Sequence, residues 1–102
     1  ANADFLINDS LRLEVKYSTQ VLSFYDLKPG AYRLMRSGQT IVLMYVLQLG
    51  KYTILDSSCS VGERYSNPCW DGKPCYPVYP DVYVSYEEAV EVIKSLIIGK
   101  CT

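Results

Sequence analysis

The pattern of apolar and polar residues predicts β-strands in the first half of the chain. Residues 11–17 alternate strictly, which is typical of a strand with one face in the core and the other in water. Residues 40–48 are apolar at almost every position, so both faces of that strand would be buried. We therefore expect 40–48 at the centre of a sheet, with 11–17 as an outer strand.

Turn sequences divide the stretch from residue 31 to residue 56 into three runs. Ser37-Gly38 and Leu49-Gly50-Lys51 are short turn sequences. They separate strand-like runs at 31–36, 40–48 and 52–55. This spacing predicts an antiparallel meander of three strands.

A helix is predicted near the end of the chain. Ser85 and Glu88 have the spacing of a capping box, which satisfies free amides of a first helical turn. Apolar residues then recur at helical spacing, namely Ala89, Val92, Ile93, Leu96 and Ile97. Because Gly99 can supply a left-handed exit, we expect a helix over 86–98 that covers the sheet.

A weak internal similarity suggests a second, shorter helix. Aligned without gaps, residues 13–30 and 82–99 are identical at five positions, close to what chance alone delivers. If the similarity is structural, a strand runs into a helix in each half, the first helix lying near 19–27 and stopped by Pro29. The whole pattern predicts one α+β domain over 1–102, with a mostly antiparallel sheet, a covering C-terminal helix and, on this interpretation, two similar strand–helix halves.

Charge and hydropathy narrow the expected partners. Ten Lys+Arg residues against eleven Asp+Glu residues give a net charge of -1, which offers no net attraction to nucleic acid or anionic membranes. The apolar run at 41–47 is far shorter than the roughly 20 residues of a membrane-spanning helix. We expect a soluble chain without a membrane partner, and nucleic acid is not the favoured ligand.

The chain has no histidine. This excludes Ser-His-Asp triads, Cys-His pairs and imidazole metal ligands, which are the commonest routes to an activated nucleophile or a catalytic zinc. We therefore expect no enzyme activity, no catalytic residues and no cofactor.

The four cysteines, Cys59, Cys69, Cys75 and Cys101, all lie in the second half. An Asp-Gly turn lies midway between Cys69 and Cys75, which favours a disulfide there and leaves Cys59 to pair with Cys101. Intervals of nine, five and twenty-five residues differ from the paired spacing of structural zinc sites. Disulfides are the favoured interpretation, while buried free thiols and a four-cysteine zinc site stay as alternatives.

Aromatic residues provide the candidate binding site. The chain has ten tyrosines, two phenylalanines and one tryptophan. In a polyproline II conformation of 76–83, Tyr76 and Tyr79 would share one face. With Trp70 and Tyr83 they would form a contact surface, since tyrosine and tryptophan dominate binding hot spots. The alternative is that these rings pack the loop onto the sheet.

Tyrosine, valine, isoleucine and leucine crowd the segments 40–48 and 76–86, beside four cysteines and no histidine. In this composition the full chain resembles the small proteins encoded by viruses of hyperthermophilic archaea, such as the filamentous viruses of Acidianus. No diagnostic motif carries the resemblance, so it transfers no site residue. It implies an interaction role in an infected cell, a location in the host cytoplasm or the virion, and tolerance of disulfides inside cells.

These observations favour non-catalytic binding of a protein or peptide, in a groove or along an open strand edge. A homodimer is among the expected assemblies. The alternative function is binding of single-stranded nucleic acid, in which tyrosines stack on unpaired bases.

Overall fold

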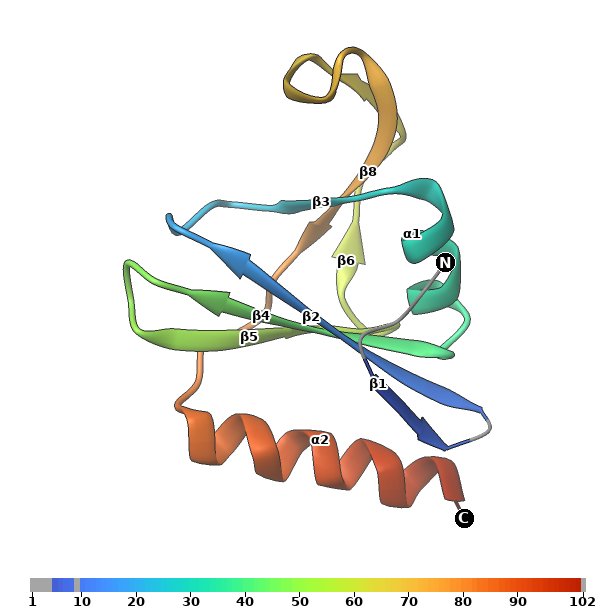
Figure 1. The fold of residues 1–102 in the computed structure, drawn as a ribbon, viewed down its shortest axis with the longest axis vertical. Coiled ribbons are helices and arrows are strands. Elements are labelled where there is room, and N and C mark those ends of the chain that lie inside the picture. The colour runs from blue at the N-terminus through green and yellow to red at the C-terminus, as the bar shows by residue number, and fades with distance from the viewer. Residues whose placement is uncertain (1–4, 9, 102) are drawn as a thin grey trace.

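The structure, a computed structural model, describes residues 5–8 and 10–101, with the side chains of 5–7 and 10–98. Within these residues, strands in the order β1-β2-β4-β5 form a first sheet, and β3-β8-β6 form a second, with β7 also paired to β8 (Figure 1). The first sheet contains β1 (Phe5–Asn8), β2 (Leu11–Ser18), β4 (Thr40–Val46) and β5 (Lys51–Leu55). The second contains β3 (Tyr25–Leu27), β6 (Ser60–Val61), β7 (Tyr65–Asn67) and β8 (Lys73–Tyr79). The helices are α1 (Pro29–Arg36) and α2 (Tyr86–Cys101), and a 3-10 turn spans Pro68–Trp70.

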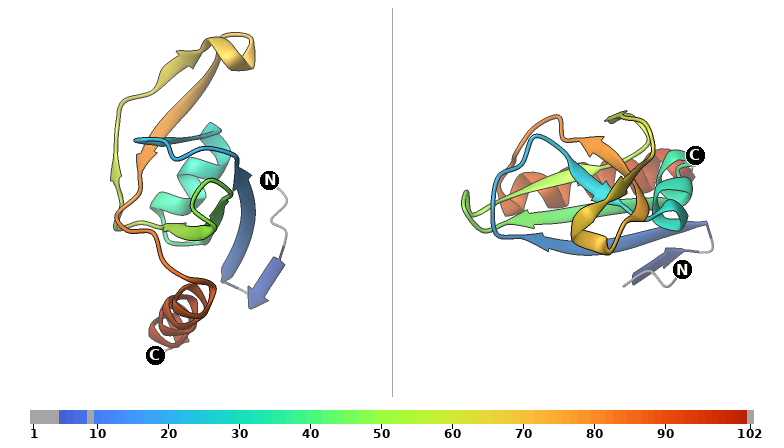
Figure 2. Two further views of the ribbon diagram at one scale, coloured as in Figure 1. Left: turned by 90° about the vertical axis from the view of Figure 1, so that its left-hand side faces the viewer. Right: turned by 90° about the horizontal axis from the view of Figure 1, so that it is seen from above.

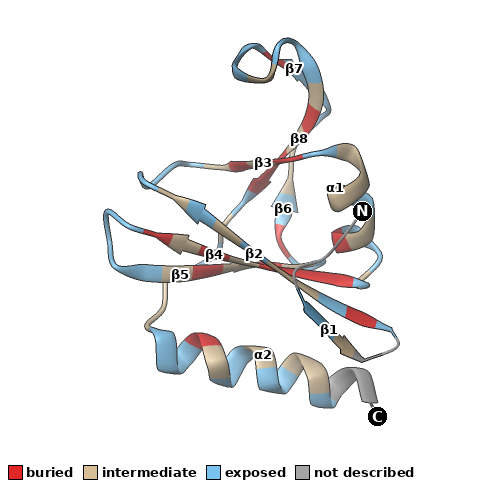
Figure 3. Cartoon of the chain, in the orientation of Figure 1, coloured by how far each residue is buried: buried red, intermediate tan, exposed pale blue. Residues whose placement is uncertain are grey.

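The predicted α+β fold is confirmed: both sheets are mostly antiparallel, and α2 packs on the first sheet. Strand β4 is central, as expected. Its residues Val42, Met44 and Val46 face the core shared with the second sheet and α1. Leu43 and Tyr45 alternate with them along the strand and so face the opposite side of the sheet. Helix α2 lies on that side (Figures 1 and 2). Buried positions concentrate on β4 and on the strands that pack against it (Figure 3).

Strand β2 is confirmed, but its predicted place at the outside of the sheet is wrong. It lies between β1 and β4, because residues 5–8 form a further strand that pairs with its first half. Its pairing with β4 is parallel. Parallel neighbours need a long crossover, and residues 19–39 provide it.

The meander prediction is wrong for residues 31–36, which form most of α1 rather than a strand. Pro29 occupies the first turn of the helix, where its missing amide hydrogen costs nothing. Ala31 and Met35, four residues apart, pack into the core from one side of α1. The sequence of this segment suits either element, and the crossover between β2 and β4 favours the helix.

The predicted helix near residues 19–27 is also wrong. Residues 25–27 form β3, with Tyr25 and Leu27 buried on one face and paired to β8. The two strand–helix halves therefore differ in structure, because only the second contains a helix at the aligned position.

Helix α2 begins at Tyr86 as predicted, and the half of the capping box that Ser85 supplies forms, while the Glu88 carboxylate bonds to the Ser85 hydroxyl. The Glu88 amide donates to Ser85 Oγ at 3.2 Å, and this hydroxyl donates to Glu88 Oε1 at 3.2 Å. Ala89 is buried against the sheet. Gly99 does not end the helix, which continues to Cys101.

None of the helices in the described ranges is long and apolar enough to cross a lipid bilayer.

Replacement of Ser85 with alanine should lower the free energy of unfolding by about 1 kcal/mol, because the N-cap acceptor of α2 is lost. The matched control is Ser95→Ala in the middle of the same helix, where alanine has the higher helix propensity. Urea unfolding of both variants measures the effect. Equal stability of the two variants would contradict the capping role.

Candidate functional site

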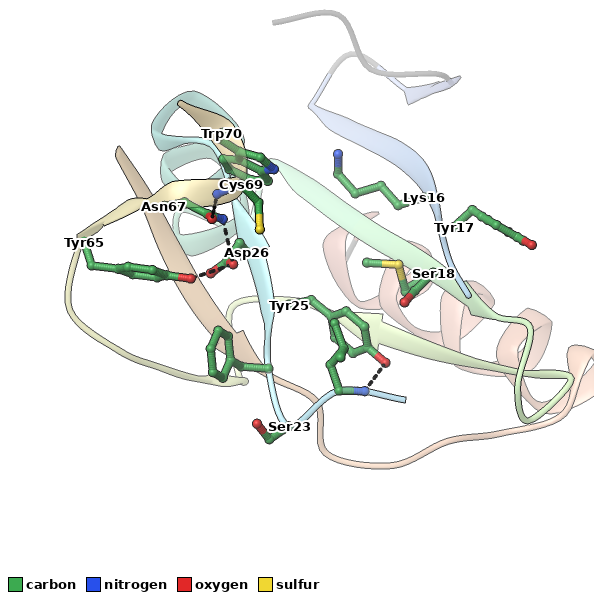
Figure 4. Close-up of a pocket in the computed structure, with 13 residues that line it drawn as sticks. Lys16, Tyr17, Ser18, Ser23, Tyr25, Asp26, Tyr65, Asn67, Cys69 and Trp70 are labelled. Atoms are coloured by element: carbon green, nitrogen blue, oxygen red, sulfur yellow. Dashed lines mark hydrogen bonds between the residues drawn. The ribbon is translucent and has the colours of Figure 1, made fainter. Parts of the chain in front are cut away.

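A cavity of about 730 Å³ lies between β3, the end of β2 and the tip of the β7–β8 hairpin (Figure 4). The consecutive residues 22–26 line it on one side and 16–18 on another. Side chains of consecutive strand residues point to opposite faces. Because Tyr25 and Asp26 both line the cavity, it runs along the edge of β3 rather than over one face.

The edge of β3 that faces away from β8 carries backbone groups that β8 does not use. Asp26 lies directly opposite Pro77, which has no amide hydrogen to donate. The Pro77 carbonyl accepts from the Gly62 amide at 2.9 Å, so it points away from β3. Asp26 and Pro77 therefore form a non-hydrogen-bonded pair, and the N–H and C=O of Asp26 point to the open edge.

Gly62 is needed for this arrangement. A Cβ at residue 62 would lie 2.7 Å from Cγ of Pro77. Only a residue without a side chain lets the backbone of 62 approach the proline ring closely enough to hold the carbonyl.

The hairpin tip places Trp70 at the cavity. Asn67 Oδ1 accepts from the Cys69 amide at 2.9 Å and so caps the 3-10 turn. Asp71 and Gly72 then reverse the chain with φ values of 55° and 75°. The half-buried indole of Trp70 lies on the cavity wall, near the Cys69 side chain (Figure 4).

Asp26 attaches the hairpin to β3. Its Oδ2 accepts hydrogen bonds from the Tyr65 hydroxyl at 2.7 Å and from Asn67 Nδ2 at 3.2 Å. Its Oδ1 is buried and has no hydrogen-bond partner among the described residues. The hydrogen bond to the Asp26 carboxylate favours the protonated hydroxyl of Tyr65 and therefore raises the pKa of Tyr65 above its ordinary value.

The cavity has mixed polarity. Its aromatic lining comes from Tyr17, Phe24, Tyr25, Tyr65 and Trp70. Lys16, half-buried on β2, lies across the cavity from the hairpin and forms no ion pair within the described part of the chain (Figure 4). The space therefore offers aromatic surfaces, one ammonium group and an open strand edge.

The four predicted binding residues are not gathered at one place. Trp70 lines the cavity. Tyr76 instead stacks on Tyr32 of α1, with ring centroids 3.9 Å apart and planes 6° apart. The hydroxyl of Tyr83 lies 3.0 Å from that of Tyr25, and Tyr79 packs against a cavity-lining ring, that of Phe24, at 5.8 Å.

The polyproline II prediction is wrong, because residues 76–79 belong to strand β8. In a strand, Tyr76 and Tyr79 point to opposite faces, so they cannot form one contact surface. Burial and its hydrogen bond to Tyr25 raise the pKa of Tyr83.

The predicted disulfides are wrong: Cys59, Cys69 and Cys75 are free. In the hairpin, Cys75 lies opposite Tyr65, whereas Cys69 lies in the 3-10 turn at the tip and is exposed. Cys59 is buried and donates to the Ile54 carbonyl. The side chain of Cys101, its predicted partner, lies outside the described residues.

The free thiols that are buried make poor nucleophiles. Burial raises the pKa of both Cys59 and Cys75, which keeps them protonated near neutral pH. Among the described residues, no three Cys, Asp or Glu side chains gather where they could hold a metal ion.

Four tyrosines form a second feature, on the face of the first sheet toward α2. Tyr17 lies opposite Tyr45, and Tyr45 lies opposite Tyr52, in adjacent strands. The ring centroids are 6.2 Å and 5.0 Å apart, and Tyr86 of α2 continues the series 5.9 Å from Tyr52. Tyr17 and Tyr86, the two ends of this tyrosine row, are 60% and 61% exposed.

No protein-family model, no curated protein and no solved structure matches the chain. The resemblance to archaeal virus proteins therefore stays a prediction.

Replacement of Asp26 with asparagine should lower the pKa of Tyr65 toward its ordinary value of about 10. In the wild type, the folded pKa is raised, so the stabilisation by this bond is complete below about pH 10 and is lost as pH rises through the folded pKa. Titration of the tyrosine ring signals by NMR measures the shift. Tyr83 is the internal control, because burial and its bond to Tyr25, rather than Asp26, raise its pKa. An unchanged titration curve for Tyr65 would refute the role of Asp26.

Proposed function

We propose that the protein is a non-catalytic module that binds an extended peptide along the open edge of β3. The observation that carries this proposal is the orientation of the Asp26 backbone, whose N–H and C=O point into a cavity that runs beside the strand. An extended partner can pair with these groups as an added strand.

The size and the lining of the cavity support binding of an extended peptide rather than contact with a flat surface. Its volume of about 730 Å³ lies within the range of roughly 300–1,000 Å³ that is usual for ligand sites. An added strand would point alternate side chains to the two faces of β3, and the cavity is lined from both of them, by Tyr25 on one face and by Phe24 and Asp26 on the other.

The side chains around the edge support selectivity. Trp70 and Phe24 offer apolar contact area at little entropic cost, which is the usual source of binding hot spots. The Lys16 ammonium favours an acidic side chain in the partner, whereas the Asp26 carboxylate is already used by Tyr65 and Asn67. We therefore expect the bound peptide to combine apolar residues with an acidic one.

Selection from a displayed library of random dodecapeptides provides the probe. Trp70 is the single tryptophan of the chain, so its fluorescence responds to a ligand that binds beside it. Selected peptides should shift its emission on binding. By calorimetry, Trp70→Ala should weaken binding at least tenfold, as expected for a central aromatic contact.

The matched control is Tyr86→Ala, which removes an exposed ring from the far side of the first sheet. It should leave peptide affinity unchanged. Peptides that bind Trp70→Ala as tightly as wild type, or a library that yields no binder, would contradict the proposal.

The tyrosine row favours a second candidate function, binding of single-stranded nucleic acid. Stacked, partly exposed rings are the platform on which unpaired bases stack. The net charge of -1 opposes it, so peptide binding is preferred.

The two candidates predict opposite mutant profiles. If the row binds bases, a fluorescein-labelled oligothymidylate should bind with steep salt dependence, and Tyr86→Ala should weaken it several-fold while Trp70→Ala does not. Fluorescence anisotropy measures both. Absence of binding at low salt would exclude this candidate.

A further inference from the structure

The two edges of the first sheet differ in how they are covered. Beyond β5, the segment before α2 pairs with the edge: the Tyr52 amide donates to the Val84 carbonyl at 2.9 Å, and the Val84 amide donates back at 2.8 Å. Beyond β1, no described strand pairs with the outer edge (Figures 1 and 2). One edge is thus partly covered by the Tyr52–Val84 bridge, whereas the described residues leave the other edge without a paired strand.

The backbone of Leu6 points to the open edge of β1. Leu6 lies opposite Arg12 of β2. The Arg12 amide donates to the Gln39 carbonyl at 2.9 Å, which lies on the β4 side, so the Arg12 backbone points away from β1. In an antiparallel ladder this makes Leu6 and Arg12 a non-hydrogen-bonded pair, and the N–H and C=O of Leu6 face outward.

The side chains of β1 leave this edge unprotected. Natural edge strands usually carry lysine or proline, or a bulge, that discourages pairing with another chain. Residues 5–7 carry no charge and no proline. The one such feature of β1 is a register shift between Leu6 and Asn8, which lies at the end of the strand and leaves Phe5 and Leu6 in regular register with β2. Phe5 and Leu6 are 58% and 65% exposed, one on each face of the strand.

We propose that this edge pairs with the same edge of a second copy of the chain, with β1 antiparallel to β1 about a two-fold axis at Leu6. At such an axis, Leu6 of one copy lies opposite Leu6 of the other, and the two residues exchange both N–H···O=C hydrogen bonds. The pairing brings no like charges together at residues 5–7, because all three residues are uncharged.

The second copy also extends an apolar surface. Phe5 shares a face with Leu13, and Val15 and Tyr17 continue that face along β2 with exposures of 42% and 60%. A two-fold axis perpendicular to the sheet keeps this face on the same side in both copies. The first sheet becomes an eight-stranded sheet, with an apolar strip at its centre and an α2 helix toward each outer end.

The contact is short, so a reversible dimer is expected rather than a permanent one. Analytical ultracentrifugation of the full chain over increasing concentration measures it. The wild type should pass from monomer to dimer below about 1 mM. The Leu6 amide should exchange with deuterium more slowly as concentration rises.

Leu6→Pro separates this pairing from the fold. The Leu6 amide is not used by β2, so proline removes a donor only from the open edge, where it is tolerated. This variant should stay monomeric with an unchanged unfolding midpoint. Leu6→Lys keeps the amide but places two like charges opposite each other at the two-fold axis, so it should also be monomeric. If the proline variant does not fold, the lysine variant tests the pairing in its place.

Trp70→Ala lies outside this edge and should dimerise like the wild type, so a failure of peptide binding and a failure of pairing are distinguishable. A wild type that stays monomeric up to about 1 mM would overturn the proposal. Dimerisation of folded Leu6→Pro or of Leu6→Lys with wild-type affinity would also overturn it.

Discussion

The burial of β4 on both faces is the constraint on which the rest of the structure depends. A strand with apolar side chains in both directions needs a layer on each side. The second sheet and α1 supply one layer over Val42, Met44 and Val46, and α2 lies on the other side, toward Leu43 and Tyr45. The parallel neighbour β2 adds a second requirement, because the connection from β2 to β4 must cross the sheet, and β3 and α1 are built from that connection.

The open edge of β3 follows from this route of the chain. β3 is the first part of the crossover and has β8 on only one side. Pro77 then decides which residues of β3 bond to β8. It has no amide hydrogen, and its carbonyl accepts from Gly62, so Asp26 opposite it forms no backbone hydrogen bond with β8. Asp26 combines both roles: its side chain holds the hairpin that carries Trp70, and its backbone faces the cavity that this hairpin helps to form.

The start of α2 and the strand β4 could be predicted from the sequence, because each depends on residues within one element. The Ser85 cap marks the first, and the apolar run at 40–46 marks the second. Residues 31–36 were wrongly predicted as a strand, since alanine, leucine and methionine suit a core helix as well as a strand, and the crossover favours the helix. The site was mostly missed. Trp70 was chosen from its residue type and lines the cavity, but its binding role stays a prediction. The bond between Asp26 and Tyr65 joins residues 39 apart, and no local pattern reveals it.

Amide hydrogen exchange along β3 tests the central claim most directly. The account assigns the backbone of Asp26 to the open edge, and those of Tyr25 and Leu27 to hydrogen bonds with β8. In the unliganded protein, the Asp26 amide should therefore exchange much faster than the amides on either side of it. Protection of Asp26 equal to that of Tyr25 and Leu27 would contradict the assignment and, with it, the binding edge.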